Sequence, residues 1–304
     1  MHRFTFSSLT FLAVAATLPA GEFQFKDGDR VALVGSTLIE REQEYGYWEL
    51  ALTTRHPGKK ITFRNLGWSG DTVWGESRVG FDLDNPQKGF ERLRDAVLAV
   101  KPTVIIVGYG TNESFAGETG LPRFKEGLNK LLNAFAPTKA RIVLLAPMHV
   151  EKHARMTPDP TTQNRNVDLY AGAIKEIARA RGALFVDLSP PSRDKPAPLT
   201  DNGIHLTAFG YQYTAARLVQ LLSPENPEPP TPLKGYALSP KAEKLRQAII
   251  EKNQLYFHRY RPQNETYLFG FRKQEQGNNA VEVPQFDALI EAKEKEIAKL
   301  LIHE

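Results

Sequence analysis

Four short polar clusters in this sequence hold side chains that together could perform acyl transfer. The first three clusters follow apolar runs closely and the fourth lies in the region after the last run; they contain, in chain order, Ser36 and Thr37, then Gly70, then Asn112, and finally Asp201 and His205. A hydroxyl can act as nucleophile, a glycine amide and an asparagine side chain can stabilise an oxyanion, and a histidine oriented by an aspartate can act as base. The residue types therefore point to an ester-hydrolysing site.

Each cluster also has a plainer interpretation when it is taken alone. The hydroxyls of Ser36 and Thr37 could cap the helix that follows, Gly70 could occupy a turn, and Asn112 and His205 could stand at helix starts. The joint occurrence of the clusters in one chain favours the catalytic interpretation.

The elements that must position these clusters alternate regularly between two types. Short apolar runs rich in Val, Ile and Leu predict buried strands at 30–34, 61–66, 104–107, 142–146 and 183–186. Amphipathic stretches predict helices around 42–55, 86–100, 121–135, 163–181 and 207–222. Such alternation predicts a parallel sheet covered by helices on both faces, with the ligand site at the carboxyl ends of the strands.

The motifs NLGWSGDT and GYGTNES carry a resemblance to a known family. Over residues 27–222 the sequence resembles the SGNH hydrolases, also called GDSL-type esterases. The resemblance implies a flavodoxin-like three-layer α/β/α sandwich with a parallel five-stranded sheet. It also implies an oxyanion hole formed by the amide of the nucleophile, the amide of Gly70 and the side chain of Asn112, with His205 as the base.

The nucleophile block departs from the family pattern. Where the family has Gly-Asp-Ser, an ungapped alignment through Gly35 and Glu40 places Ser36 at the Asp position and Thr37 at the nucleophile position. A threonine hydroxyl can attack an ester, although its extra methyl group restricts χ1 and crowds the approach. Ser36 would serve instead only if the turn slipped by one residue.

The acid position also departs from the family pattern. The family has an Asp three residues before the histidine, and here that residue is Asn202, with Asp201 one position further back. An Asn can orient an imidazole through its carbonyl oxygen but cannot offset the developing charge, so Asp201 is the better acid if the loop lets it reach His205.

Several residues around these clusters are candidates for contacting substrate. Trp68 and Tyr109 flank the predicted pocket, and Asn202 is a further candidate for binding substrate. Both aromatic rings could instead fill the rim of the core. The segment 264–279, which includes Arg272, mixes aromatic, amide and charged residues. It could cover the site and contact a glycan, or it could simply tether the C-terminal helices to the body.

The two ends of the chain differ in composition from the hydrolase-like region. Residues 1–20 have the basic start and short apolar run of a secretory signal peptide, which leaves 21–222 as the hydrolase-type domain. Residues 223–234 form a Pro-rich linker, and 235–304 predict a helical extension packed on the domain.

Composition excludes several other mechanisms. The chain has no cysteine, which removes disulfides, thiolate metal sites and Cys nucleophiles. A net charge of 39 − 35 = +4 over 304 residues gives no indication of a nucleic-acid partner, and no further apolar run is long enough to span a membrane. His149 and His153 have an i, i+4 spacing that could suit a metal, but no carboxylate cluster accompanies them, and we expect neither metal nor cofactor.

The sequence thus predicts a secreted or periplasmic SGNH-type ester hydrolase. The expected substrate is a small-molecule or glycan ester, such as an acetylated carbohydrate or another polar ester. The alternative is a catalytically impaired SGNH-like protein that binds glycans. The sequence gives no indication of the oligomeric state.

Overall fold

A single parallel sheet forms the centre of the molecule. The computed structural model describes residues 23–190, 197–223 and 237–302. The predicted signal peptide and all but the first residue of the predicted Pro-rich linker lie outside the described residues. The five strands pair in the order β2-β1-β3-β4-β5, with all neighbours parallel. Their bounds are β1 Arg30–Gly35, β2 Thr62–Asn65, β3 Val104–Gly108, β4 Arg141–Leu145 and β5 Leu184–Val186.

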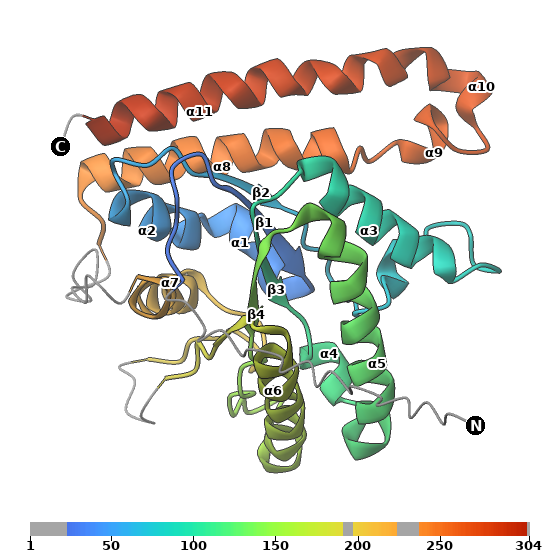
Figure 1. Ribbon diagram of the computed structural model, residues 1–304, viewed down its shortest axis with the longest axis vertical. Coiled ribbons are helices and arrows are strands. Elements are labelled where there is room, and N and C mark those ends of the chain that lie inside the picture. Colours follow the sequence, from blue (N-terminus) through green and yellow to red (C-terminus); the bar gives the residue numbers. More distant parts are fainter. Residues whose placement is uncertain (1–22, 191–196, 224–236, 303–304) are drawn as a thin grey trace, which may run out of the picture.

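Helices cover both faces of this sheet and create two separate cores (Figure 1). Side chains of a strand alternate between its faces, so Val31 and Leu33 enter one core while Ala32 and Val34 enter the other. The first core is closed by α1 Thr37–Tyr45, α2 Tyr47–Arg55 and α7 Ala208–Leu222. The second is closed by α3 Gln87–Val100, α5 Gly117–Phe135 and α6 Thr161–Arg181. The predicted three-layer α/β/α sandwich is therefore confirmed.

The helical region predicted at 42–55 is two helices, the first of which begins earlier than predicted. Helix α1 starts at Thr37, with only Ser36 between it and β1, and its last residue is Tyr45. The C-cap residue Gly46 has a φ of 67°, a left-handed conformation that glycine adopts without strain. Helix α2 follows at once. Short elements complete the body, namely η1 Glu76–Arg78, α4 Thr111–Ser114 and η2 Ala136–Thr138.

The C-terminal extension lies along the β2 edge of the sheet. It contains α8 Pro240–Tyr260, α9 Glu265–Leu268, α10 Lys273–Gln276, η3 Gly277–Gln285 and α11 Phe286–Ile302. Helix α8 packs Leu245 and Ile249 against Leu50 of α2. Beside this apolar contact, the buried ammonium group of Lys252 lies 2.5 and 2.7 Å from the two carboxylate oxygens of Glu49. Apolar burial and a buried ion pair thus hold the extension on the body.

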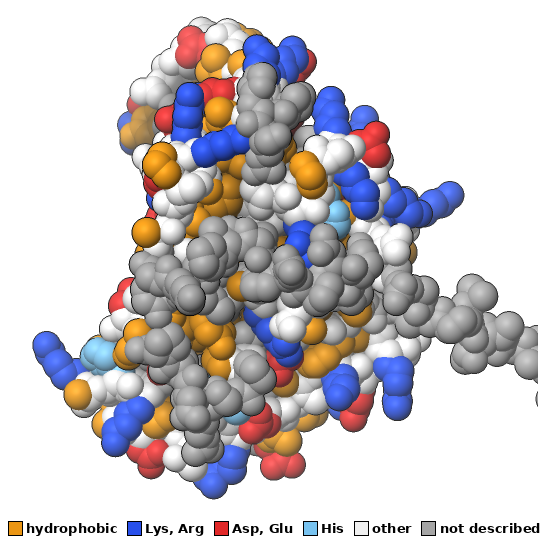
Figure 2. All heavy atoms as spheres, turned by 90° about the vertical axis from the view of Figure 1, so that its left-hand side faces the viewer, with side chains coloured by type: hydrophobic (Ala, Val, Ile, Leu, Met, Phe, Trp, Pro, Cys, Tyr) orange, Lys and Arg blue, Asp and Glu red, His pale blue; other side chains and the backbone are white. Residues whose placement is uncertain are grey.

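The surface carries both signs of charge. Figure 2 shows one face, on which the described Lys and Arg side chains are interspersed with Asp and Glu and with hydrophobic side chains. Within the described ranges, none of the helices is long and apolar enough to cross a membrane.

Candidate active site

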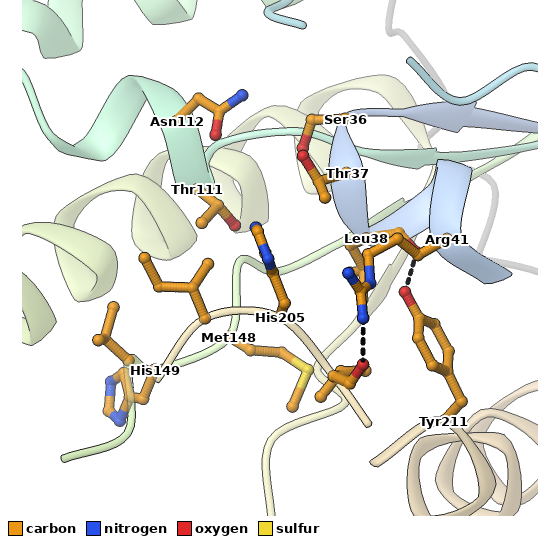
Figure 3. A pocket seen from close by; sticks show the side chains of 13 residues that line it. Ser36, Thr37, Leu38, Arg41, Thr111, Asn112, Met148, His149, His205 and Tyr211 are labelled. Atoms are coloured by element: carbon orange, nitrogen blue, oxygen red, sulfur yellow. Dashed lines mark hydrogen bonds between the residues drawn. The ribbon is translucent and has the colours of Figure 1, made fainter. Parts of the chain in front are cut away.

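Three of the predicted clusters line one cavity at the carboxyl edge of the sheet, and the fourth, Gly70, is bonded to a residue that lines it. The lining includes Ser36, Thr37, Asn112 and His205. In Figure 3 the His205 ring points from its loop into the space between Thr111 and Thr37, with Ser36 and Asn112 beyond. The structure therefore places a hydroxyl, an amide side chain and an imidazole around one small space.

Ser36 and Thr37 occupy different positions at the start of α1. Ser36 is the N-cap residue, and its side chain is buried. Thr37 is the first helical residue, where a backbone N–H has no partner within the helix. The N–H of Gly70 donates to the Oγ1 of Thr37 over 3.2 Å. Of the two hydroxyls, only that of Thr37 is bonded to this amide.

The Gly70 amide is positioned by a loop that packs tightly on α1. Asn65, at the end of β2, donates through Nδ2 to the carbonyl of Ile39 and accepts the N–H of Gly67 through Oδ1. Gly67 lies so close to α1 that a Cβ atom on it would stand 2.2 Å from the backbone nitrogen of Glu40. Gly70 has a φ of 74°, which favours glycine. Both glycines are thus required by the backbone path.

Asn112 is fixed from the opposite side of the cavity. It is the second residue of α4, and its Nδ2 donates to the backbone carbonyl of Asp71 over 2.8 Å. Asp71 is itself fully buried, and its carboxylate accepts the Nε–H of Arg78 and the hydroxyl of Tyr109. Each amide nitrogen carries two hydrogens, so the second N–H of Asn112 remains for a ligand.

His205 has an unexpected partner on its Nδ1. The Nδ2 of Asn202 lies 3.2 Å from this nitrogen. The Oδ1 of Asn202 is already occupied, because it accepts the backbone N–H groups of Ile204 and His205 at 2.9 and 2.8 Å. The Asn202 oxygen is therefore not available to orient the ring. An NH₂ group facing Nδ1 favours Nδ1 as the acceptor, and hence the tautomer that carries its proton on Nε2.

Asp201 does not take the place of the missing acid. Its carboxylate pairs with Arg41 at 3.4 Å and is about half exposed. Among the hydrogen bonds of the described residues, none joins the Asp201 side chain to the His205 ring, and none joins that ring to Thr37. The ring and the Thr37 hydroxyl face each other across the cavity, as apo sites often do before substrate tightens them.

Burial and a nearby cation lower the pKa of His205 from its ordinary value of 6.5. Partial burial is the larger cause, and the positive charge of Arg41 adds to it, while the negative charge of Asp201 opposes both. A histidine with a lowered pKa stays neutral at neutral pH, which is the form that can accept a proton.

Replacing Arg41 with glutamine should raise the pKa of His205. The change removes the cation and leaves the Asp201 carboxylate unpaired, and both effects favour the protonated ring. An NMR titration of the imidazole measures the shift, with Arg94→Gln as a control because Arg94 pairs with Asp95 on the exposed surface. An unchanged or lower pKa in Arg41→Gln would show that the two charges do not act on the ring.

None of the four predicted substrate contacts lines the cavity. Asn202 contacts the His205 ring instead, as described above. Tyr109 is buried, and its hydroxyl bonds to Asp71. Trp68 is half-buried between the guanidinium groups of Arg261 and Arg78. Arg272 bonds to Glu275 and Tyr267 within the C-terminal extension. No residue of 262–284 is among those that line the cavity, which agrees with a tether and not with a roof.

Arg41 is a site residue that the sequence analysis missed. It lines the cavity, and it stands four residues after Thr37 on α1. Residues at i and i+4 share a helix face, so this spacing was an available signal once α1 was known to begin at Thr37.

His149 and His153 have separate partners. The Nε2 of His149 lies 2.6 Å from Asp168, and the Nδ1 of His153 accepts the N–H of Met156. Within the described ranges, no group of three or more His, Asp or Glu side chains is placed to hold a metal ion.

Comparison with known proteins agrees with this geometry. The model of the GDSL-like lipase/acylhydrolase family matches residues 31–213. No curated protein matches the chain.

Solved structures share the fold at low sequence identity. An acetylxylan esterase from Geobacillus stearothermophilus is 21% identical, with a TM-score of 0.51 over 66% of this chain and 96% of that chain. An alpha/beta hydrolase from the metagenome of Lake Arreo, Spain, is 20% identical, with a TM-score of 0.50 over 66% of this chain and 98% of that chain. Catalytic mutants of the former replace a serine, an aspartate or a histidine, the aspartate standing three residues before the histidine.

Proposed function

Because the chain belongs to the GDSL-like lipase/acylhydrolase family of ester hydrolases, we propose that it hydrolyses an ester with the hydroxyl of Thr37 as nucleophile. The observation that carries this proposal is the 3.2 Å hydrogen bond from the Gly70 amide to the Thr37 hydroxyl. Thr37 and His205 line the same cavity. Nucleophile, oxyanion donor and base then occupy one site.

The proposed reaction proceeds in two halves. In the first, the Thr37 oxygen bonds to the ester carbonyl carbon while His205 takes the hydroxyl proton. The resulting oxyanion accepts the N–H groups of Gly70, Thr37 and the Asn112 side chain. Collapse of this intermediate breaks the bond to the alcohol, which leaves with the proton from His205. In the second half, water replaces the alcohol and releases the acid, regenerating the Thr37 hydroxyl.

The size of the cavity favours a small acyl group. Its volume is about 40 Å³. We propose an acetylated carbohydrate or a similar polar ester as substrate, in line with the acetylxylan esterase that shares the fold. The signal-peptide pattern of residues 1–20 supports activity outside the cytoplasm.

One observation favours a second candidate function. The Asn202 amide nitrogen lies 3.2 Å from Nδ1 of His205 while the Asn202 oxygen accepts two backbone N–H groups. This arrangement favours the Nε2–H tautomer, in which Nε2 cannot accept the nucleophile's proton. Base catalysis then depends on a minor tautomer and is slow. In the limit, the site binds a glycan ester without cleaving it, which is the impaired glycan-binding protein considered above.

Turnover of p-nitrophenyl acetate distinguishes the two functions. We expect slow release of p-nitrophenol by the protein and at least a tenfold loss in His205→Ala, because general-base catalysis contributes about 10²- to 10⁴-fold when it is fully effective. His149→Ala is the matched control, since His149 lines the same cavity but points away from Thr37 (Figure 3). Equal rates in the protein and in His205→Ala would leave the binding function as the better account.

A further inference from the structure

We propose that Arg261, at the end of α8, is a positioning residue that holds the loop carrying the Gly70 amide against α1. The inference rests on the proposed function for its catalytic consequence but not for the positioning itself. The C-terminal extension lies outside the family-matched region 31–213, and this inference assigns it a role at the active site.

Arg261 closes a chain of contacts that ends beside Gly70. Its Nη1 donates to a carboxylate oxygen of Glu40 over 2.9 Å. The Glu40 carboxylate in turn accepts the backbone N–H and the hydroxyl of Ser69, at 2.8 and 2.9 Å. Ser69 immediately precedes Gly70, so the position of the Gly70 amide depends on where Glu40 holds Ser69.

Arg261 also covers the loop from outside. Its guanidinium carbon lies 3.5 Å from the centre of the Trp68 ring, and that of Arg78 lies 5.2 Å from the same centre. An arginine stacked on an indole gains both cation–π attraction and contact area. The neighbouring Tyr260 donates its hydroxyl to the carbonyl of Gly67 over 3.2 Å. Two consecutive residues at the end of α8 therefore contact this loop.

The loop needs such support because its tip is exposed. Ser69 and Gly70 are exposed, and Gly70 has a left-handed backbone conformation. An oxyanion donor contributes only when it is held in place before the charge develops. Removing Arg261 would free the Glu40 carboxylate to leave Ser69 for water, and the Gly70 amide would then sample other orientations.

Charge gives a second reason for Arg261. Glu40 stands three residues after Thr37 on the same helix, and its carboxylate bonds to Ser69, the residue before the oxyanion donor Gly70. A negative charge there opposes a developing negative charge, and the guanidinium group of Arg261 offsets it.

Hydrogen–deuterium exchange and turnover together test this role. In Arg261→Ala we expect faster exchange of the amides in residues 66–71 and a kcat for p-nitrophenyl acetate about tenfold lower, with KM nearly unchanged, because a small misplacement of a reacting group costs rate more than binding. Arg261→Lys keeps the charge but loses the planar stacking, and it should recover part of kcat.

Arg259→Ala is the matched control. Arg259 lies on the same helix end and pairs with the exposed Asp287, so neither the exchange of residues 66–71 nor kcat should change. Unchanged exchange in Arg261→Ala, or an equal change in Arg259→Ala, would overturn the positioning role. Faster exchange in a protein that shows no turnover at all would keep the positioning role and overturn the proposed function.

Discussion

Replacing Asn202 with aspartate should raise the rate of ester hydrolysis by about 10²- to 10⁴-fold. In serine proteases, the opposite substitution at the orienting aspartate lowers kcat by about 10⁴-fold because it stabilises the wrong histidine tautomer. In this protein the side-chain oxygen of Asn202 already accepts two backbone N–H groups, and its NH₂ group faces Nδ1 of His205. An aspartate would keep the first oxygen in place and present a second oxygen to Nδ1–H.

The tautomer can be measured independently of the rate. Nitrogen chemical shifts of the His205 ring should show the proton on Nε2 in the protein and on Nδ1 in Asn202→Asp. The added carboxylate should also raise the pKa of His205. Asn85→Asp is the charge-matched control, because Asn85 is exposed and does not line the cavity. An Nδ1–H tautomer in the unmodified protein would contradict this account of its slow turnover.

Replacing Thr37 with alanine should abolish covalent catalysis, with a loss of at least about 10²-fold in kcat/KM. The loss stays below that of a fast hydrolase, because the oxyanion donors retain some activity and little base catalysis remains to be lost. The kcat/KM of Thr37→Ser should equal or exceed that of the unmodified protein, since serine lacks the methyl group that restricts χ1.

Ser36→Ala is the matched control for Thr37→Ala. Its buried N-cap hydroxyl has no hydrogen bond to the Gly70 amide, so most of the rate should remain when esterase kinetics are compared across the three variants. The reverse pattern, with Ser36→Ala inactive and Thr37→Ala active, would show that the turn presents the other hydroxyl.

The sheet could be predicted from the sequence because its signals are local. Each buried strand is a short apolar run bounded by turn residues, and the first three polar clusters follow strands closely, so their meeting at one edge follows from parallel pairing. The division at Gly46 was missed because the apolar pattern continues through both helices. Only the left-handed conformation of this glycine shows where α1 ends.

The electrostatics of the site could not be predicted because they depend on distant partners. Asp201 pairs with Arg41, which is 160 residues away in sequence, and Arg261 meets Glu40 across 221 residues. Neither pair has a local pattern. The role of Asn202 depends on which of its two side-chain atoms faces the ring, and this is decided by two backbone amides in a tight loop.

Covalent labelling with a fluorophosphonate tests the central claim most directly. Attack by the nucleophile forms an oxygen–phosphorus bond and releases fluoride, which leaves the probe on the attacking residue. Trypsin cleavage after Arg30 and Arg41 gives one peptide, VALVGSTLIER, that contains both candidate hydroxyls, and tandem mass spectrometry distinguishes them. We predict an adduct on Thr37 that forms faster in Asn202→Asp than in the unmodified protein and is lost in His205→Ala. An adduct on Ser36, or no adduct on this peptide in Asn202→Asp, would contradict the claim that Thr37 is the nucleophile of an ester hydrolase.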